Sequence, residues 1–220
     1  MRRPMRVEET RVGITGEATV EMFDRFQESM GKKGYFITDS ILEAGITTGK
    51  VLEIGPGPGR LGHDWLGKTG GTTLVGAEIS GAMVELAERN ARNARLENRC
   101  DYQLCSALEL PFEKESFHGV FSNGSFHEWE NPLEVFNQAY GVLKRGGKFV
   151  VGDLRRDIPL FMEKMALLGC GEKVMKKGFL TSLGAAYTPG EADLLMQLSH
   201  FHGGRLSKTA MGMILVMEKS

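Results

Sequence analysis

Short apolar segments alternate along the chain with longer segments whose apolar residues recur every three or four positions. A short run that is apolar throughout is typical of a strand covered on both faces, and the longer spacing is typical of an amphipathic helix. Because strands that alternate with helices are joined by right-handed crossovers, the pattern predicts a mainly parallel sheet between two layers of helices. Strands are predicted at residues 49–55, 73–79, 101–106, 116–123 and 148–154, and helices at residues 17–30, 37–45, 60–68, 80–96 and 132–144.

The last third of the chain has a different pattern. Residues 158–169 and 188–201 have helical spacing, and two strand-like segments, 204–210 and 211–219, follow with little more than a turn between them. Strands that follow each other so closely pair antiparallel, because a parallel return needs roughly a dozen residues or more. The sequence therefore predicts an α/β fold whose sheet ends in an antiparallel hairpin.

Composition narrows the function without revealing it. The chain has 220 residues, a mass of 24.2 kDa and a formal net charge of −1, which suits a single domain. Such a charge gives no general attraction to nucleic acid or anionic lipid, and no apolar run reaches the roughly 20 residues that span a bilayer. The three cysteines include no C-x-x-C pair, and the N-terminus lacks the apolar core of a secretory signal. We expect a cytoplasmic protein that binds neither nucleic acid nor membranes.

The segment VLEIGPGPGR, residues 51–60, joins a predicted strand to a predicted helix. Gly55, Gly57 and Gly59 remove three Cβ atoms, so the main chain there can adopt positive φ and touch a ligand. Pro56 and Pro58 stiffen the loop between them. Because open parallel sheets bind ligands beyond the carboxyl ends of their strands, we expect a ligand at this loop.

Two carboxylates help to choose between ligand classes. The dinucleotide fingerprint G-x-G-x-x-G needs glycine where this chain has Arg60. Glu53 lies two residues before the first glycine, where it would repel a pyrophosphate and attract a cationic or zwitterionic ligand. Glu78, at the end of the second predicted strand, suits hydrogen bonding to ribose hydroxyls. The alternative for Glu78 is an exposed carboxylate that merely ends its strand.

Four segments in order resemble the successive motifs of class I S-adenosylmethionine-dependent methyltransferases, and are most similar to the small-molecule branch that includes ubiquinone/menaquinone-type enzymes. They read VLEIGPGPGRLG, VGAEISGAMVELAERNA, CSALELPFEKESFHGVFSNGSFHEW and AYGVLKRGGKFVVGDL, and together they cover residues 50–154. The resemblance implies a Rossmann-like three-layer sandwich. It also implies a seven-stranded, mostly parallel sheet with an antiparallel C-terminal strand, in agreement with the predicted hairpin.

The resemblance also implies a site for S-adenosyl-L-methionine, with S-adenosyl-L-homocysteine as product. Ser106 stands where relatives usually have an aspartate that bonds the adenine amino group, so that contact is open. By position, the methionine portion would meet Glu53, Gly55, Pro56, Gly57 and Gly59; the ribose would meet Glu78; the adenine would meet Ile79, Ser106, Ala107 and Leu108; and the transferred methyl group would lie near Asn123, Gly124 and Ser125.

The candidate catalytic residues are His127 and Glu128, which follow the fourth predicted strand. Methyl transfer is an in-line displacement that depends on proximity and alignment, and it needs a general base only if the acceptor atom carries a proton. Either residue could be that base or could orient the acceptor; the alternative is that His127 only fixes the loop. Tyr35, Arg155 and Arg156 are candidates for contact with the acceptor.

We therefore expect one methyltransferase domain that acts on a small molecule, without a metal, as a monomer or homodimer. Its expected parts are an N-terminal helical lid (1–47), a cofactor-binding core (48–154), a helical acceptor-side elaboration (155–203) and a C-terminal β-hairpin (204–220).

Two other functions remain open. One is an NAD(P)-dependent oxidoreductase, which Arg60 and the lack of a Tyr-x-x-x-Lys pair disfavour. The other is a non-catalytic regulatory protein that binds S-adenosylmethionine.

Overall fold

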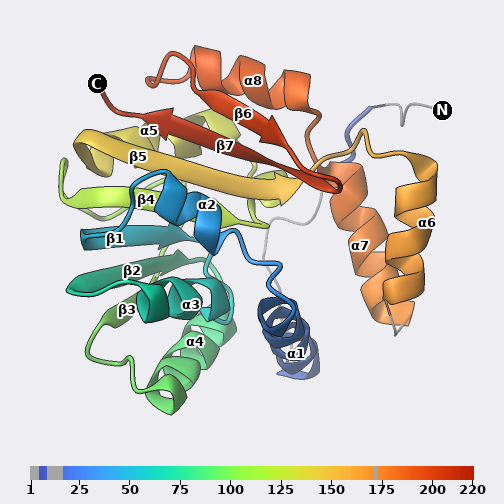
Figure 1. Ribbon diagram of the computed structural model, residues 1–220, viewed down its shortest axis with the longest axis horizontal. Coiled ribbons are helices and arrows are strands. Elements are labelled where there is room, and N and C mark those ends of the chain that lie inside the picture. Colours follow the sequence, from blue (N-terminus) through green and yellow to red (C-terminus); the bar gives the residue numbers. More distant parts are fainter. Residues whose placement is uncertain (1–4, 9–16, 171–172) are drawn as a thin grey trace.

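The computed structural model describes residues 5–8, 17–170 and 173–220. A seven-stranded sheet forms its centre, with strand order β3-β2-β1-β4-β5-β7-β6 (Figure 1). The first five strands run parallel, and β7 pairs antiparallel with both β5 and β6. The predicted fold class is confirmed. The strands are β1 (Gly49–Ile54), β2 (Thr72–Glu78), β3 (Cys100–Leu104), β4 (Phe117–Asn123), β5 (Leu143–Leu154), β6 (Arg205–Lys208) and β7 (Gly212–Glu218).

Helices cover both faces of the sheet, and each face has its own hydrophobic core. Along β1, Leu52 and Ile54 point into one core and Val51 into the other, as a sheet buried on both sides requires. The helices are α1 (Glu17–Lys32), α2 (Thr38–Glu43), α3 (Arg60–Lys68), α4 (Gly81–Ala94), α5 (Pro132–Val142), α6 (Leu160–Gly169), α7 (Lys173–Ala185) and α8 (Pro189–Leu198), with a 3₁₀ turn, η1 (Phe126–Glu128).

The structure departs from the sequence pattern at two places. The predicted helix 132–144 ends at Val142, because fully buried Leu143 takes an extended conformation and pairs with Phe117 of β4. Helix α7 was not predicted, and its sequence includes Gly178 and Gly184, a residue type that weakens a helical interior. The part of the expected lid at residues 1–4 and 9–16 lies outside the described residues.

The strand order brings the candidate site together. Neighbours β1 and β4 are far apart in sequence, and the chain leaves them toward opposite sides of the sheet. Ligands in open α/β sheets bind at such a reversal, beyond the carboxyl ends of the strands.

Across the described ranges, none of the helices has the length and apolar character needed to cross a membrane.

Candidate functional site

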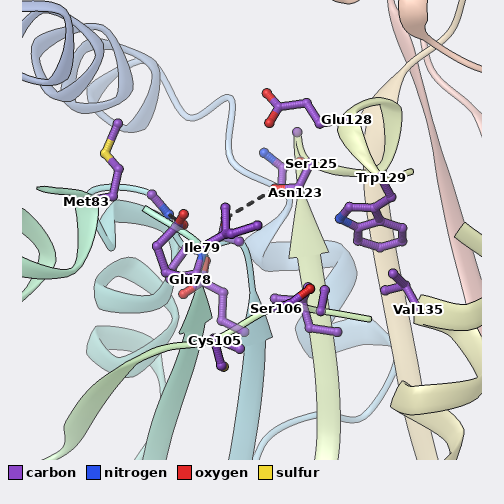
Figure 2. Close-up of a pocket in the computed structure, with 18 of the residues that line it drawn as sticks. Glu78, Ile79, Met83, Cys105, Ser106, Asn123, Ser125, Glu128, Trp129 and Val135 are labelled. Atoms are coloured by element: carbon purple, nitrogen blue, oxygen red, sulfur yellow. Dashed lines mark hydrogen bonds between the residues drawn. The ribbon is translucent and has the colours of Figure 1, made fainter. Parts of the chain in front are cut away.

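A cavity of about 160 Å³ opens at the carboxyl ends of β1, β2 and β4 (Figure 2). Of the predicted cofactor-binding residues, all except Gly59 line it. The cavity-lining members are Glu53, Gly55, Pro56, Gly57, Glu78, Ile79, Ser106, Ala107, Leu108, Asn123, Gly124 and Ser125. Strand ends that are distant in sequence thus bring these residues to one place.

The glycines of the loop after β1 all have positive φ: 66° at Gly55, 52° at Gly57 and 76° at Gly59. A Cβ atom on Gly55 would collide with the neighbouring Ser125 side chain, whose hydroxyl donates to the Gly55 carbonyl at 3.3 Å. Gly59 instead begins α3 in a left-handed conformation, and a Cβ there would lie 2.6 Å from the Tyr102 hydroxyl. Gly59 therefore serves packing beneath the loop, while Gly55 and Gly57 shape the cavity wall.

Glu78 ties this loop to the end of β2. One carboxylate oxygen accepts a hydrogen bond from the Gly57 N–H at 3.0 Å, and the other accepts one from the Ser80 N–H at 2.9 Å. Burial raises the pKa of Glu78, and these backbone donors oppose that rise. The carboxylate is thus held rigidly at the cavity edge.

Glu53 is a buried carboxylate at the cavity wall, with only 2% of its surface exposed. Among the described residues, nothing donates a hydrogen bond to its Oε2 atom. Burial, and to a lesser extent the negative charge of Glu78, raises the pKa of Glu53 to about 8. Because Glu53 lines the cavity, a cationic ligand group bound there would favour the charged form of its carboxyl group.

Glu53→Gln is expected to change how stability depends on pH. The pKa of Glu53 rises from 4.5 to about 8 on folding, so the folded protein binds more protons between these values. The free energy of unfolding therefore falls as pH rises through this window, and Gln removes that fall. Between pH 5 and pH 8, the free energy of unfolding of Glu53→Gln should therefore rise by about 1–4 kcal/mol relative to that of the wild type. Denaturant unfolding at each pH measures this difference in the free energy of unfolding, and Glu85→Gln, at an exposed position, is the control. Parallel pH profiles for wild type and Glu53→Gln would contradict the raised pKa of Glu53.

Helix α1 closes one side of the cavity with Phe23 and Gln27, which the sequence analysis missed. Between them, Asp24 accepts two hydrogen bonds of 2.8 Å from the Arg60 guanidinium, at the start of α3. The Asn90 amide donates to Asp24 and to the Pro58 carbonyl, both at 3.0 Å. We call Asp24, Arg60 and Asn90 the α1 clamp; it holds α1 against the glycine loop.

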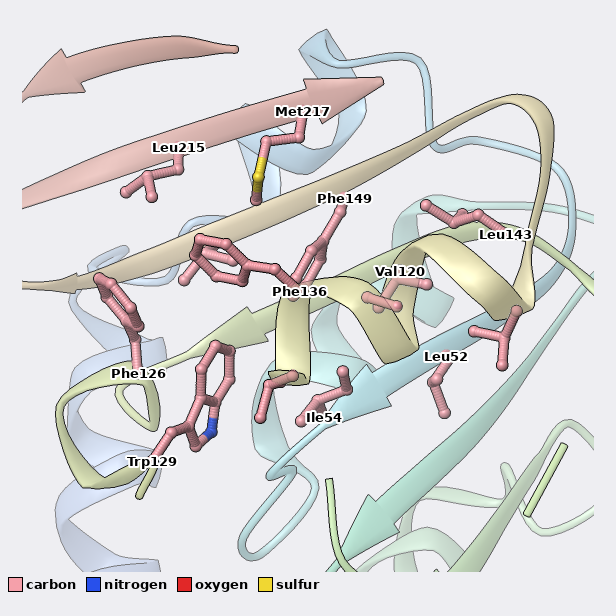
Figure 3. Close-up of a cluster of buried hydrophobic side chains, with 14 of the residues drawn as sticks. Leu52, Ile54, Val120, Phe126, Trp129, Phe136, Leu143, Phe149, Leu215 and Met217 are labelled. Atoms are coloured by element: carbon pink, nitrogen blue, oxygen red, sulfur yellow. The ribbon is translucent and has the colours of Figure 1, made fainter. Parts of the chain in front are cut away.

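The 3₁₀ turn η1 places Glu128 at the cavity wall and His127 behind it. His127 is buried; its backbone N–H donates to Asp153 at 2.9 Å, and its Nδ1 lies 2.8 Å from the other carboxylate oxygen. Its Nε2 lies 3.8 Å from a Glu128 carboxylate oxygen. Neighbouring Phe126 stacks on Tyr187 at 4.5 Å and belongs to the aromatic core in Figure 3, which anchors the turn.

The three predicted acceptor-contact residues do not line the cavity in this structure. Tyr35 is 63% exposed, and Arg155 lies 3.5 Å from the Asp157 carboxylate. The buried Arg156 guanidinium donates to the Ala186 carbonyl and to Glu191, so it fastens the start of α8. Among the described residues, no group of three His, Cys, Asp or Glu side chains could hold a metal ion.

Sequence comparison finds methyltransferases. A family model described as a methyltransferase domain matches residues 52–151. Erythromycin 3''-O-methyltransferase of Saccharopolyspora erythraea is 34% identical over 118 residues, which cover 53% of this chain and 38% of that protein. An uncharacterized protein of Methanocaldococcus jannaschii is 32% identical over 152 residues, 66% of either chain. The chain thus spans well under half of the erythromycin enzyme.

Comparison with solved structures also finds a methyltransferase. A crystal structure from Methanococcus maripaludis, assigned as an S-adenosyl-L-methionine-dependent methyltransferase, has a TM-score of 0.76 and 20% identity, and the match covers 99% of this chain and 98% of that one. The likeness shows a shared fold over nearly the whole length. Residues 52–151 thus match the methyltransferase domain, and the chain shares the fold of that S-adenosyl-L-methionine-dependent methyltransferase.

Proposed function

We propose that the protein transfers a methyl group from S-adenosylmethionine to a small-molecule acceptor. The observation that carries this proposal is a single cavity that joins a loop without Cβ atoms to two buried carboxylates, Glu53 and Glu78. The relative whose name specifies erythromycin supports a small molecule as acceptor.

The cavity residues fit this cofactor. Glu53 lies at the cavity wall, where the positive charge of the methionine portion would favour the ionised form of its carboxyl group, and Glu78 offers its carboxylate to the ribose. Ile79, Ala107 and Leu108 supply apolar surface for the adenine. The Ser106 hydroxyl accepts a hydrogen bond from the Leu108 N–H at 3.2 Å, so it shapes the turn at the adenine edge. When bound, S-adenosylmethionine supplies an activated methyl group on a sulfonium.

The protein's own contribution is to align the acceptor, exclude water and receive a proton. We assign Glu128, which lines the cavity, as the group that receives the proton lost by the methyl acceptor; His127 lies behind it. Asp153 holds the Nδ1 side of the His127 ring, so Nε2 faces Glu128 as a proton acceptor. We also propose that residues 1–47 act as the lid and residues 155–203 shape the acceptor side.

Calorimetry with S-adenosylmethionine and with NADH tests the cofactor. We expect micromolar binding of S-adenosylmethionine and none of NADH; the reverse result would favour an oxidoreductase. Single-turnover incubation with a metabolite extract tests the reaction, and S-adenosylhomocysteine should form. Tight binding without this product from any fraction would instead indicate a regulatory protein.

Arg60→Gln is expected to weaken S-adenosylmethionine binding about tenfold, because it breaks the paired hydrogen bonds that hold α1 over the cavity. Arg89→Gln is the matched control, since Arg89 also pairs with α1, through Glu21, but at an exposed position where such pairs contribute little. Calorimetry measures both dissociation constants. Equal affinity in the two variants would show that the α1 clamp does not serve the cofactor site.

A further inference from the structure

Residues 5–8 form a short N-terminal strap that lies against α7 and η1. The N–H of the residue after Arg6 donates to the Gly184 carbonyl at 3.2 Å, so the strap runs beside the end of α7, where Figure 1 shows it in blue. The Arg6 side chain reaches further. One of its terminal nitrogens donates to the His127 carbonyl at 2.9 Å, and its Nε donates to the Ala185 carbonyl at 2.7 Å. One side chain thus ties the strap to η1 and to the end of α7.

The Arg6 guanidinium also stacks on an aromatic pair. Its central carbon lies 4.4 Å from the centre of the Tyr187 ring, and that ring stacks on Phe126, the first residue of η1, at 4.5 Å. The Arg6 side chain is only 17% exposed, so little water competes with these contacts. A planar guanidinium stacks on a ring while it donates hydrogen bonds in its own plane, an arrangement that the compact ammonium of lysine does not match. The strap therefore holds η1 through a ring as well as through a carbonyl.

The contact with Arg6 completes the support of η1 around His127. On one side the His127 N–H donates to Asp153 at 2.9 Å, and on the other the His127 carbonyl accepts from Arg6. A 3₁₀ turn has poor hydrogen-bond geometry of its own, and η1 has three residues, so its orientation depends on such outside partners. Glu128 belongs to the same turn and lines the cavity, whereas Arg6 is not among the described residues that line it. Arg6 therefore acts on the cavity through η1.

We propose that Arg6 is a positioning residue for methyl transfer: it fixes η1 in the orientation that presents Glu128 to the acceptor. This inference rests on the proposed methyl transfer and adds to it a residue outside the cavity. The alternative is that Arg6 only stabilises the fold. The two roles differ in their effect on the reaction, because a displacement of about 1 Å in a catalytic group costs about a hundredfold in rate.

Arg6→Ala is expected to lower turnover at saturating S-adenosylmethionine about ten- to a hundredfold and to leave the dissociation constant of this cofactor unchanged. Arg99→Ala is the matched control, since Arg99 also donates to backbone carbonyls, but those of Leu66, Thr69 and Thr72, which do not line the cavity. This control should lower the free energy of unfolding without changing turnover. Turnover is measured as S-adenosylhomocysteine formed with the active fraction of a metabolite extract. An equal loss of turnover in the two variants would mean that Arg6 only stabilises the fold.

Chemical rescue tests the guanidinium itself. Arg6→Ala removes the equivalent of ethylguanidinium, so millimolar ethylguanidinium should restore most of the lost turnover, whereas ethylammonium should restore little. Arg6→Lys keeps the positive charge without the planar group; it should fold and lose less turnover than Arg6→Ala. Circular dichroism verifies folding of both variants. No restoration by ethylguanidinium, together with full turnover in Arg6→Lys, would overturn the role assigned to the guanidinium.

NMR of the histidine side-chain nitrogens tests the positioning without an acceptor. The chain has five histidines, and the signals of His127 are those that disappear in His127→Asn. Arg6→Ala should shift these signals and ethylguanidinium should return them, while the signals of His118, at the opposite end of β4, stay in place. His127 signals that do not move in Arg6→Ala would overturn the proposal, whatever the turnover.

The same measurements separate this inference from the proposed function. A wild-type protein that binds S-adenosylmethionine but forms no S-adenosylhomocysteine from any fraction would reject the proposed methyl transfer. The His127 signals would then decide by themselves whether Arg6 holds η1 in place.

Discussion

Gly57→Val is expected to raise the dissociation constant for S-adenosylmethionine about a hundred- to ten-thousandfold. Gly57 has a φ of 52°, a conformation that a β-branched residue rarely adopts, so valine would force the loop into another path. The backbone N–H would then leave the Glu78 carboxylate, and a charged hydrogen bond that fixes Glu78, the proposed ribose contact, would be lost. The branched side chain would also stand on the cavity wall.

Gly67→Ala is the matched control for this variant. Gly67 lies inside α3, has no positive φ, and has open space around its Cβ position. Alanine favours a helix by about 1 kcal/mol over glycine, so this variant should bind like wild type and unfold no earlier. Calorimetry measures binding, and circular dichroism verifies folding. A folded Gly57→Val protein with micromolar affinity would show that the ligand does not touch this loop.

The glycine loop was predictable from sequence because its requirements are local. Positive φ at Gly55 and Gly57 is a property of single residues, and a short apolar strand before them fixes where the loop lies. Glu53 and Glu78 were predictable for the same reason, since each lies at a fixed distance along a strand that ends at the cavity. Such positions depend on backbone geometry rather than on distant partners.

The α1 clamp was not predictable, because it depends on the tertiary arrangement. Asp24 and Arg60 are separated by 36 positions, and each looks like an ordinary surface charge in its own helix. Phe23 and Gln27 come to the cavity only because this pair orients α1. In the sequence, Arg60 speaks only against the dinucleotide fingerprint, whereas the structure also shows its partner, Asp24.

Arg156 shows a second reason why side-chain contacts could not be predicted from the sequence. Its place after β5 was predicted correctly, and that end of the strand does face the ligand side of the sheet. The direction of its side chain is decided by the Ala186 carbonyl and Glu191, which belong to a later part of the chain. A side chain with several rotatable bonds follows its strongest partner, and no local pattern identifies that partner.

His127→Asn is expected to lower kcat about a hundred- to ten-thousandfold while leaving the affinity for S-adenosylmethionine unchanged. Asparagine can still donate to Asp153 from near the position of Nδ1, but it has nothing in place of Nε2. Affinity should persist because His127 lies behind the cavity wall and does not line it. Turnover is measured as S-adenosylhomocysteine formed with the most active acceptor, and binding by calorimetry. His118→Asn, at the opposite end of β4, is the control and should change neither. Unaltered turnover in His127→Asn would mean that His127 only fastens η1 to β5 and that Glu128 accepts the proton without its help.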